Sequence, residues 1–418
     1  MQECWTMNPS ILQGEIQIPS ARNALHRSII AASLSHGKST IQPFIPFDEL
    51  LATLKVIKAF GASYKISNET LTIKGAFPPK VKKKAVFIGH SMTTLKLTLP
   101  IALTLNGPFT YKIAFDSIDA SLHPFVHFNE PKSRVTVNKR ALNNAPIHLN
   151  TLESSRLING FLLAAPLYND SKDFSLQAHD LPLDFMLTLS TMKSFNHTFI
   201  ENNEGFSVPK NTRYEANDVL VEGDYGIGGF FLIAGLKNPS IRISNISHFS
   251  YQSDYSVINL IKKASGKIIH DEHGYLTAES ELNGFKTSFK NKHSVLPHGL
   301  MLAALSNEPS TLIKLKSYKQ TKEDTLNTLL KTLGKFNIRY KFHSNTLIVH
   351  GTSPPFNGPS EITLDENFRI ALFQFFMCTF NNKPTTIKNM QSITNHYKNF
   401  YTLMRALNAD INNGKPLN

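Results

Sequence analysis

Cysteine, tryptophan and long apolar runs are scarce in this sequence. Its 418 residues include only two cysteines, Cys4 and Cys378, and one tryptophan. Two thiols are too few for a disulfide framework or a cysteine-based zinc cluster, which predicts a reducing, cytoplasmic setting and no bound metal. The longest apolar stretches, residues 227–236 and 370–380, fall well short of the roughly 20 residues that span a bilayer. We therefore expect no membrane segment and no membrane partner.

Signal and cofactor motifs are also missing. The first ten residues, MQECWTMNPS, carry the acidic Glu3 and neither a basic start nor an apolar core, so no secretory signal is expected. No P-loop, zinc-ligand spacing or dinucleotide-binding glycine turn occurs in the chain. These absences predict a protein that works without a cofactor.

Basic residues outnumber acidic ones. With 44 Lys and Arg against 31 Asp and Glu, the formal net charge is +13, which favours phosphorylated metabolites, nucleic acid or anionic membranes as partners. The basic run Lys80–Lys84 is short and typical of a solvated turn, so we expect no nucleic-acid partner. The 41% hydrophobic residues, 21 Gly and 22 Pro are those of a globular chain, and its length predicts two or three domains.

A helix stop followed by a strand recurs at intervals of roughly 70 residues. Each stop is a Gly or Asn, residue types that tolerate the left-handed backbone at the end of a helix. Alternating hairpins are predicted after two of these stops, with turns at Asn68–Glu69 and at Ser344–Asn345. The six predicted stops are Gly61, Asn129, Asn196, Gly266, Asn337 and Asn408.

A second series of helices interleaves with the first. These helices are rich in small and apolar residues, as core helices are, and each ends before a strand containing Thr or Ser. Each repeat thus holds two helices and several strands, which predicts a mixed α/β (α+β) fold of six repeats. The predicted stops of the second series are Gly37, Gly107, Asn169, Asn238, Asn307 and Asn382.

The six repeats, the opening Gly14–Ser20 and the run Arg22–Arg27 resemble the EPSP synthase (3-phosphoshikimate 1-carboxyvinyltransferase) family over essentially the whole chain. The resemblance implies the two-lobed enolpyruvyl transferase fold, with three βαβαββ-type repeats per lobe, helices inside and sheets outside. It places residues 21–221 in the first lobe and residues 1–20 plus 222–418 in the second, with the active cleft between the lobes. It also implies a carboxyvinyl transferase that acts on phosphoenolpyruvate and shikimate 3-phosphate in the shikimate pathway, which leads to the aromatic amino acids.

Several residues in this sequence match or stand in for family residues that hold the two substrates. Arg27 and Arg369 match family arginines, and Lys96 takes an arginine position. Arg22 replaces a lysine that assists proton transfer, and Asn23 takes the place of a serine. The resemblance implies that Ser154, Ser155 and Arg156 bind the phosphate of shikimate 3-phosphate. It also implies that Asp254 acts as general base.

Other positions depart from the family pattern on the phosphoenolpyruvate side. Met92 occupies a glycine position, where a bulky side chain should obstruct close approach of the ligand to the backbone. Glu323 lies next to the position of the catalytic glutamate, and a shift of one residue could restore a carboxylate. The remaining departures replace charged family residues: Lys322 for glutamate, Thr325 for arginine, Asn395 for lysine and His123 for arginine.

Three interpretations stay open at this point. The first is a divergent, monomeric EPSP synthase-like transferase that binds a shikimate 3-phosphate-like anion but has weak or lost activity, with phosphoenolpyruvate a doubtful ligand. The second is a non-catalytic homologue that binds a phosphorylated anion or a protein partner. The third is the UDP-N-acetylglucosamine carboxyvinyltransferase branch, because Arg22-Asn23-Ala24 resembles its Lys-Asn-Ala. Neither Cys4 nor Cys378 lies where that branch has its reactive cysteine.

Overall fold

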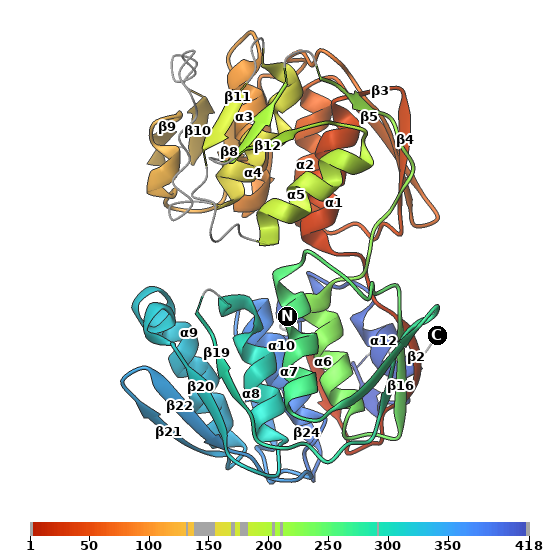
Figure 1. Ribbon diagram of the computed structural model, residues 1–418, viewed down its shortest axis with the longest axis vertical. Coiled ribbons are helices and arrows are strands. Elements are labelled where there is room, and N and C mark those ends of the chain that lie inside the picture. The colour runs from red at the N-terminus through yellow and green to blue at the C-terminus, as the bar shows by residue number, and fades with distance from the viewer. Residues whose placement is uncertain are drawn as a thin grey trace. The chain divides into compact units, whose positions relative to one another are not determined.

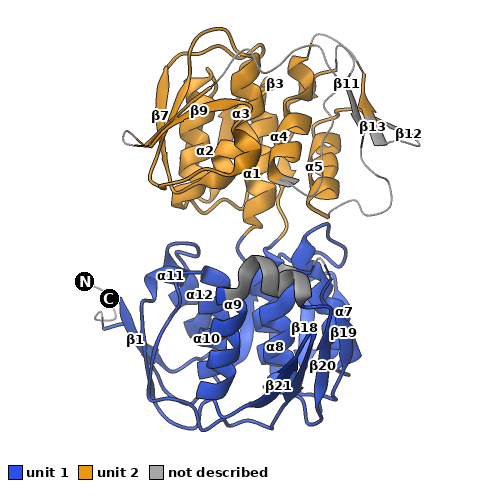
Figure 2. Ribbon diagram, turned by 90° about the vertical axis from the view of Figure 1, so that its left-hand side faces the viewer, with its two compact units in different colours: residues 1–19, 223–418 blue, residues 20–222 orange. Residues whose placement is uncertain are grey.

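Two compact units make up the chain. The computed structural model describes residues 3–130, 133–137, 155–168, 172–175, 183–202, 205–209, 212–290 and 292–414. Unit 1 comprises residues 1–19 and 223–418, and unit 2 comprises residues 20–222 (Figure 2). The lobe boundaries expected from the family resemblance lie one residue away from these. Within the described ranges, no helix combines the length and the apolar character needed to cross a bilayer.

Unit 1 contains three four-stranded sheets that share one strand order (Figure 1). In each sheet an edge strand runs parallel to the strand that follows an inner helix, and two antiparallel strands complete the sheet. The sheets are β2(Gln13–Gln17)-β16(Ser240–Ser244)-β18(Gly274–Ala278)-β17(Lys267–Asp271), β19(Lys286–Ser288)-β20(Ser310–Ile313)-β22(Thr346–His350)-β21(Arg339–His343) and β23(Glu361–Thr363)-β24(Thr385–Lys388)-β1(Cys4–Met7)-β25(Ile411–Asn412).

Three inner helices of unit 1 pack against one another beneath these sheets. They are α6(Tyr225–Gly235), α8(Leu296–Ala304) and α10(Phe368–Cys378). Their stacked and edge-on rings, such as Phe230 and Phe231 against Phe376, fill the space between them. The other helices are α7(Val257–Lys263), α9(Lys316–Lys335), α11(Gln391–Thr394), α12(Phe400–Ala406) and the 3-10 turns η5(Ser253–Ser256) and η6(His293–Val295).

Unit 2 repeats the arrangement. Two of its sheets have the same order, β15(Val219–Leu220)-β4(Lys38–Gln42)-β6(Thr70–Lys74)-β5(Ser63–Ser67) and β7(Ala85–Gly89)-β8(Thr110–Ile113)-β10(Arg134–Val137)-β9(Val126–Asn129). The others are β11(Lys172–Ser175)-β13(Gly205–Val208)-β12(Ile200–Asn202) and the pair β3(Ser35–His36)-β14(Tyr214–Glu215). The helices are α1(Arg22–Ser33), α2(Asp48–Ala59), α3(Met92–Thr104), α4(Ser155–Leu163), α5(Leu183–Ser194), η1(Ala120–Leu122) and η4(Ala165–Leu167).

Most of the predicted stops of the first helix series are confirmed by backbone geometry. Gly61, Asn196, Asn337 and Asn408 have φ values of 109°, 55°, 58° and 59° directly after a helix. In the fourth repeat the left-handed residue is Ser265, with φ 62°, rather than the predicted Gly266. The prediction for Asn129 is wrong, because this residue ends strand β9 and the nearby helix is reduced to the short turn η1.

The second series behaves differently at its helix ends. Gly37 and Gly107 are left-handed, with φ 106° at both. Asn238 follows helix α6 without that geometry and instead donates its Nδ2 to the Ala234 carbonyl oxygen at 2.8 Å. Asn307 and Asn382 follow α8 and α10, and Asn169 lies outside the described residues.

Both predicted hairpins are present. Strands β5 and β6 pair from Ser67 opposite Thr70, with Asn68 and Glu69 at φ 46° and 55° in the turn. Strands β21 and β22 pair from His343 opposite Thr346, and Ser344 has φ 54°. Left-handed residues in a two-residue turn match the twist of the strands that they connect.

We predict that a methyl group added at Gly351 destabilises unit 1, because Gly351 passes close to the end of helix α8. A Cβ atom there would lie 2.3 Å from the carbonyl oxygens of Ala303 and Ser306. Gly351→Ala should lower the free energy of unfolding by about 1–3 kcal/mol, as overpacked sites do. Gly334 in helix α9 has no atom within 4 Å of such a Cβ, so the matched Gly334→Ala should stabilise by up to about 1 kcal/mol. Urea unfolding of both variants checks this, and equal effects would contradict the close approach.

Candidate functional site

An ion pair joins two of the sequence-predicted residues in unit 1. The Arg369 guanidinium donates to the Asp254 carboxylate through Nη1 to Oδ1 at 2.9 Å and through Nη2 to Oδ2 at 2.8 Å. The Asp254 side chain is 6% exposed and that of Arg369 is 23% exposed. Two parallel N–H···O bonds of this kind fix both side chains in one geometry.

Local structure on both sides holds this pair in place. Asp254 lies in η5, and the preceding Gln252 donates Nε2 to the Gly223 carbonyl and accepts from the Tyr225 amide at the start of α6. Arg369 lies in the first turn of α10, where Asn367 caps the helix by accepting from the Arg369 amide at 3.1 Å. The ring of Phe368 lies 5.2 Å from the guanidinium carbon. Two helix starts, 115 residues apart in sequence, therefore present the two charges to each other.

The charge state of Asp254 follows from this pairing. Burial alone would raise the pKa of its carboxyl, but the charge and hydrogen bonds of Arg369, with smaller effects of His298 and Ser294, hold the pKa below its usual value. A general base works best when its pKa lies near the working pH, so this pairing makes Asp254 a weak base as it stands. Together the neighbouring charges and hydrogen bonds thus outweigh the effect of burial on the Asp254 carboxyl and set the direction of its pKa shift.

His298 lies close to this pair and was not predicted from the sequence. Its ring is fully buried, stacks on Phe230 at 4.1 Å between centroids, and pairs through Nε2 with the Gly226 carbonyl at 3.2 Å. Burial lowers the pKa of His298 to about 4 even though the charge of Asp254 opposes the shift. The ring is therefore neutral at pH 7. The sequence did not indicate that His298 lies beside this ion pair, because a single histidine in the apolar run 295–305 looks the same as an ordinary core residue.

Arg27 is a buried cation in unit 2. Its side chain donates Nε to the Thr188 hydroxyl at 2.7 Å, Nη1 to the Asn23 carbonyl at 2.8 Å and Nη2 to the Asp184 carbonyl at 3.2 Å. All three acceptors are neutral oxygens on α1 and α5. Burial lowers the pKa of Arg27 to about 10, so the guanidinium keeps its charge at neutral pH.

Three predicted anion-binding arginines act on one histidine. His26 is buried, and burial together with the positive charges of Arg27, Arg22 and Arg156 lowers its pKa to about 3. Arg22 begins α1, with its guanidinium carbon 5.9 Å from the Phe47 ring, and Arg156 lies exposed near the start of α4. Their joint effect on His26 means that these cations lie near one another on unit 2.

The chain segment with Met92 starts helix α3. Ser91 caps the helix by accepting from the Thr94 amide at 3.2 Å, and hydroxyl contacts run from Ser91 through Thr94 and Thr53 to the His26 ring. Met92 is half-buried at the first position of the helix.

Lys96, one helical turn further along α3, is committed to an ion pair. Its Nζ donates to Asp119 Oδ2 at 2.6 Å. Burial opposes the shift, but hydrogen bonds from Lys96 and Ser121 lower the pKa of Asp119 to about 2. The partner of Lys96 was not predicted from the sequence, because Asp119 lies 23 residues away in a segment without periodicity.

The remaining predicted residues are placed as follows. Ser154 lies outside the described residues, and Ser155 begins α4. Lys322 lies in α9, where its side chain is not described, and Thr325 on the same helix is half-buried. Asn395 and His123 are exposed. Asp224, which precedes α6, caps that helix by accepting from the Gly226 amide at 2.8 Å.

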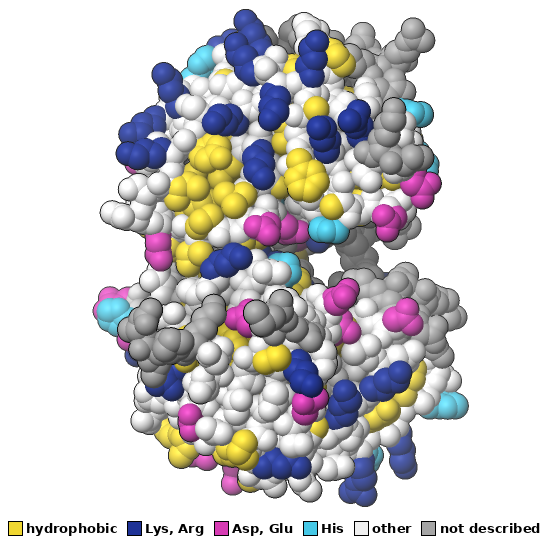
Figure 3. Space-filling view, turned by 180° about the vertical axis from the view of Figure 1, so that it is seen from behind, with side chains coloured by type: hydrophobic (Ala, Val, Ile, Leu, Met, Phe, Trp, Pro, Cys, Tyr) yellow, Lys and Arg dark blue, Asp and Glu magenta, His cyan; other side chains and the backbone are white. Residues whose placement is uncertain are grey.

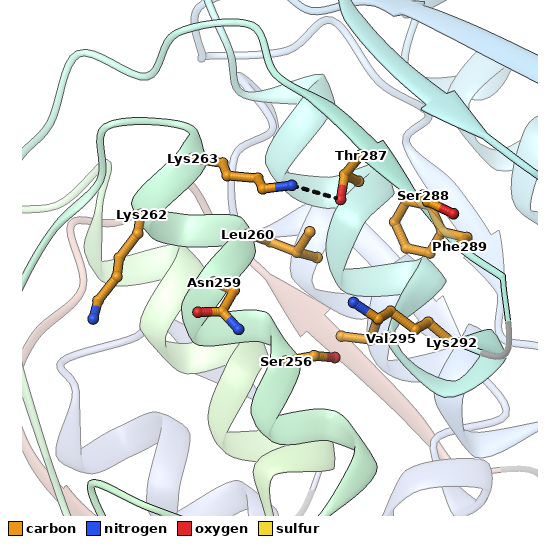
Figure 4. Close-up of a pocket in the computed structure, with 10 residues that line it drawn as sticks. All are labelled: Ser256, Asn259, Leu260, Lys262, Lys263, Thr287, Ser288, Phe289, Lys292 and Val295. Atoms are coloured by element: carbon orange, nitrogen blue, oxygen red, sulfur yellow. Dashed lines mark hydrogen bonds between the residues drawn. The ribbon is translucent and has the colours of Figure 1, made fainter. Parts of the chain in front are cut away.

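A separate pocket of about 390 Å³ lies in unit 1 between α7, β19 and η6 (Figure 4). In Figure 4 the Lys262 side chain extends away from the other labelled residues, whereas Lys263 donates Nζ to the Thr287 hydroxyl at 3.2 Å. None of the residues predicted from the sequence lines this pocket. No group of three or more His, Cys, Asp or Glu side chains in the described part of the chain is placed to share a metal ion.

Comparison with known proteins places the whole fold in one class. An EPSP synthase from Acinetobacter baumannii has a similar structure, with a TM-score of 0.83 over 99% of this chain and 100% of that chain at 16% identity. The enolpyruvyl transferase NikO from Streptomyces tendae reaches a TM-score of 0.76 over 99% of both chains at 14% identity. The architecture is thus that of the two-lobed enolpyruvyl transferases.

Sequence comparison then narrows the class. The family model of EPSP synthase (3-phosphoshikimate 1-carboxyvinyltransferase) matches residues 7–112 and 124–404. The 3-phosphoshikimate 1-carboxyvinyltransferase of Clostridioides difficile is 26% identical over 96% of this chain and 97% of its own length, and that of Clostridium novyi is 25% identical over 94% of each. This chain belongs to the EPSP synthase family, as the sequence resemblance predicted.

We predict that Arg369→Leu destabilises unit 1 by about 3–5 kcal/mol at pH 7, because it leaves the Asp254 carboxylate buried and unpaired. The wild-type pair lowers the folded-state pKa of Asp254, so its stabilising effect is complete above about pH 4 and is lost as the pH falls through the folded-state value. The wild-type advantage over Arg369→Leu should therefore shrink on acidification. Urea unfolding between neutral and acidic pH measures it.

The double variant Asp254→Asn/Arg369→Leu is the control for this prediction. It removes both charges, so it should recover much of the lost stability and show little of the pH dependence. If Arg369→Leu lowers the free energy of unfolding by less than about 1 kcal/mol, the Asp254–Arg369 pair contributes no more than an exposed ion pair does, and the prediction is wrong.

Proposed function

We propose that this protein binds a shikimate 3-phosphate-like anion and transfers the carboxyvinyl group of phosphoenolpyruvate slowly or not at all. It would act as a monomer in the cytoplasm. Its membership of the EPSP synthase family supports the substrate class, since the relatives named above are 3-phosphoshikimate 1-carboxyvinyltransferases. The observation that best supports slow or absent carboxyvinyl transfer is the Asp254–Arg369 ion pair.

The cations of unit 2 support the binding of a phosphorylated anion. Arg22, Arg27 and Arg156 all act on His26, and the described hydrogen bonds of Arg27 go to neutral oxygens. The guanidinium of Arg27 stays charged at neutral pH, with the carboxylate of Asp184 as a nearby opposite charge. Exposed Arg156 at the start of α4 adds a charged donor beside backbone N–H groups that favour anions. In this proposal Arg156, Ser154 and Ser155 bind the phosphate of the ligand, and Arg27 and Asn23 bind its carboxylate.

The other half of the chemistry is weakened at several positions. Arg369, which matches a family arginine, has its charge neutralised by Asp254 at 2.8 Å, and Lys96 is likewise paired with Asp119. Met92 adds a side chain where the family has glycine. Lys322 stands where the family has its catalytic glutamate, a loss that typically removes about 10²–10⁴ in rate.

A non-catalytic homologue is the second candidate, and the same ion pair favours it. If Asp254 and Arg369 form a permanent structural link, neither is free to serve as base or anion clamp. Such a protein would keep the phosphate site of unit 2 and bind an anion or a protein partner without turnover. Its family membership favours both candidates over the UDP-N-acetylglucosamine branch.

We predict that Arg156→Ala weakens binding of shikimate 3-phosphate about 10-fold to 150-fold, the range expected for one lost charge-assisted hydrogen bond. Isothermal titration at low salt measures the affinity. Exposed Arg213, which lies 5.3 Å over the Phe77 ring, supplies the matched control, and Arg213→Ala should leave the affinity unchanged. Equal affinities of wild type and Arg156→Ala would remove the phosphate assignment.

We predict that the unaltered protein releases phosphate from phosphoenolpyruvate and shikimate 3-phosphate far more slowly than a family enzyme assayed beside it. Restoring the family residues at the altered positions should raise the rate, provided that Asp254 still acts. The restored variant carries Arg22→Lys, Met92→Gly, Lys322→Glu, Thr325→Arg and Asn395→Lys. A coupled phosphate-release assay measures both proteins.

Asp254→Asn in the restored variant is the control, and it should abolish the regained rate. If the unaltered protein turns over rapidly, and Asp254→Asn abolishes that activity, the proposal that the phosphoenolpyruvate site is weakened is wrong. Binding of shikimate 3-phosphate with no turnover in either background would favour the non-catalytic homologue.

A further inference from the structure

Lysines are concentrated in one part of unit 2. Residues 58–112 contain nine lysines and a single acidic residue, Glu69. Figure 3 shows lysine and arginine side chains gathered over one face of unit 2, where few acidic side chains interrupt them. The exposed members on two neighbouring sheets and their linker, here called the basic sheet face, are Lys38, Lys65, Lys74, Lys80, Lys82, Lys83, Lys84, Lys112 and Arg134.

Strand pairing sets like charges directly opposite each other on this face. Lys38 of β4 is the partner of Lys74 on β6, and Lys112 of β8 is the partner of Arg134 on β10. Like charges at directly opposed positions destabilise a sheet. No ion pair within the described chain neutralises any member of the face. The arrangement works against stability, so folding alone does not account for it.

An exposed aromatic ring stands in line with two of these cations. Phe87 on edge strand β7 is 55% exposed and is the partner of Lys112, which pairs in turn with Arg134. Arg134 is opposite Asn129 on β9, so one row of side chains crosses all four strands. The inward residues between them, such as Val86, are buried. The register thus places an exposed phenyl ring in the same cross-strand row as two positive charges.

The next row on the same face supplies polar groups. Thr110 of β8 and Thr136 of β10 are partners whose hydroxyl oxygens lie 3.2 Å apart, and exposed His127 of β9 lies opposite Thr136. The row therefore offers hydroxyl and imidazole groups for hydrogen bonds. Together the two rows combine a stacking surface, cations and hydrogen-bonding groups on one sheet.

We propose that the basic sheet face binds single-stranded nucleic acid, with the sugar–phosphate backbone along the lysines and a base stacked on Phe87. Single strands bind to positively charged surfaces on which aromatic side chains stack their bases, and sheets are a common platform for such stacking. A membrane surface fits less well, because peripheral membrane binding usually inserts an amphipathic helix and this face is built of strands. Lys80–Lys84 alone predicts no nucleic-acid partner, but strand pairing adds cations on β4 and β6 and on β8 and β10.

Fluorescence anisotropy with a fluorescein-labelled oligouridylate tests the proposal, using the full-length protein between about 50 and 200 mM salt. The logarithm of the association constant should fall linearly with the logarithm of the salt concentration. Lys112→Ala/Arg134→Ala should make that slope shallower by about 1.4, since each lost phosphate contact on a single strand accounts for about 0.7. Phe87→Ala should weaken binding about fivefold to a hundredfold with the slope unchanged.

Matched controls separate this surface from the general charge of the protein. Arg339→Ala/Lys341→Ala removes two exposed cations from strand β21 of unit 1 and should leave binding unchanged. Thermal unfolding should show Lys112→Ala/Arg134→Ala at least as stable as wild type, because a like-charge pair is relieved. Loss of binding without loss of stability assigns the effect to the contact itself.

Three outcomes would overturn the proposal. One is that the unit 1 control loses as much affinity as the Lys112 and Arg134 variant. Another is that Phe87→Ala binds the oligouridylate as tightly as wild type. The third is that vesicles containing phosphatidylserine, or a duplex of the same length, bind the face in a Lys112-dependent way while the single strand does not.

Discussion

The inner helices impose the constraint on which the rest of the structure depends. Helices α6, α8 and α10 are buried along nearly their whole length, with residues such as Ile233, Phe373 and Leu302 inaccessible to water. A helix that is apolar all round has no face for solvent, so it must be surrounded. Three such helices pack on one another and are covered by three sheets, and the same solution recurs in unit 2. Polar residues of unit 1 stand at the starts of these helices, with Asp224 before α6, His298 in the first turn of α8 and Arg369 in the first turn of α10.

Charge is distributed unequally over those helix starts. In unit 2, Arg22 and Arg27 stand near His26, which burial keeps neutral. In unit 1, Arg369 and Asp254 neutralise each other. On unit 2 a phosphate would meet Arg27, whose described hydrogen bonds go to neutral oxygens and which has the carboxylate of Asp184 as a nearby opposite charge. On unit 1 it would have to displace a carboxylate that accepts two hydrogen bonds from Arg369. Some of the basic residues at family positions are thus paired with carboxylates of the protein itself, as Arg369 is with Asp254 and Lys96 is with Asp119.

Local rules were enough to predict much of the fold. Asn196, Asn337 and Asn408 were predicted as helix stops because few residues tolerate a positive φ, and the same rule predicted the turn at Asn68–Glu69. It failed at Asn129, where an asparagine ends a strand instead, because the rule does not distinguish the two uses of that residue. The site was harder to predict. The pairing of Asp254 with Arg369 and of Lys96 with Asp119 depends on how distant segments meet, and a motif specifies residue types without specifying which charges they meet.

The two ends of the chain meet in the third sheet of unit 1. Strand β1 pairs with β24 and β25, and β2 pairs with β16, so residues 4–17 belong to a sheet system whose other strands come after residue 223. During synthesis residues 4–17 therefore have no partner strands until residues beyond 223 have been made, whereas residues 20–222 are contiguous and can form unit 2 in the meantime. Unit 2 can therefore form from one continuous segment, whereas unit 1 needs two segments that are separated in the chain by the whole of unit 2.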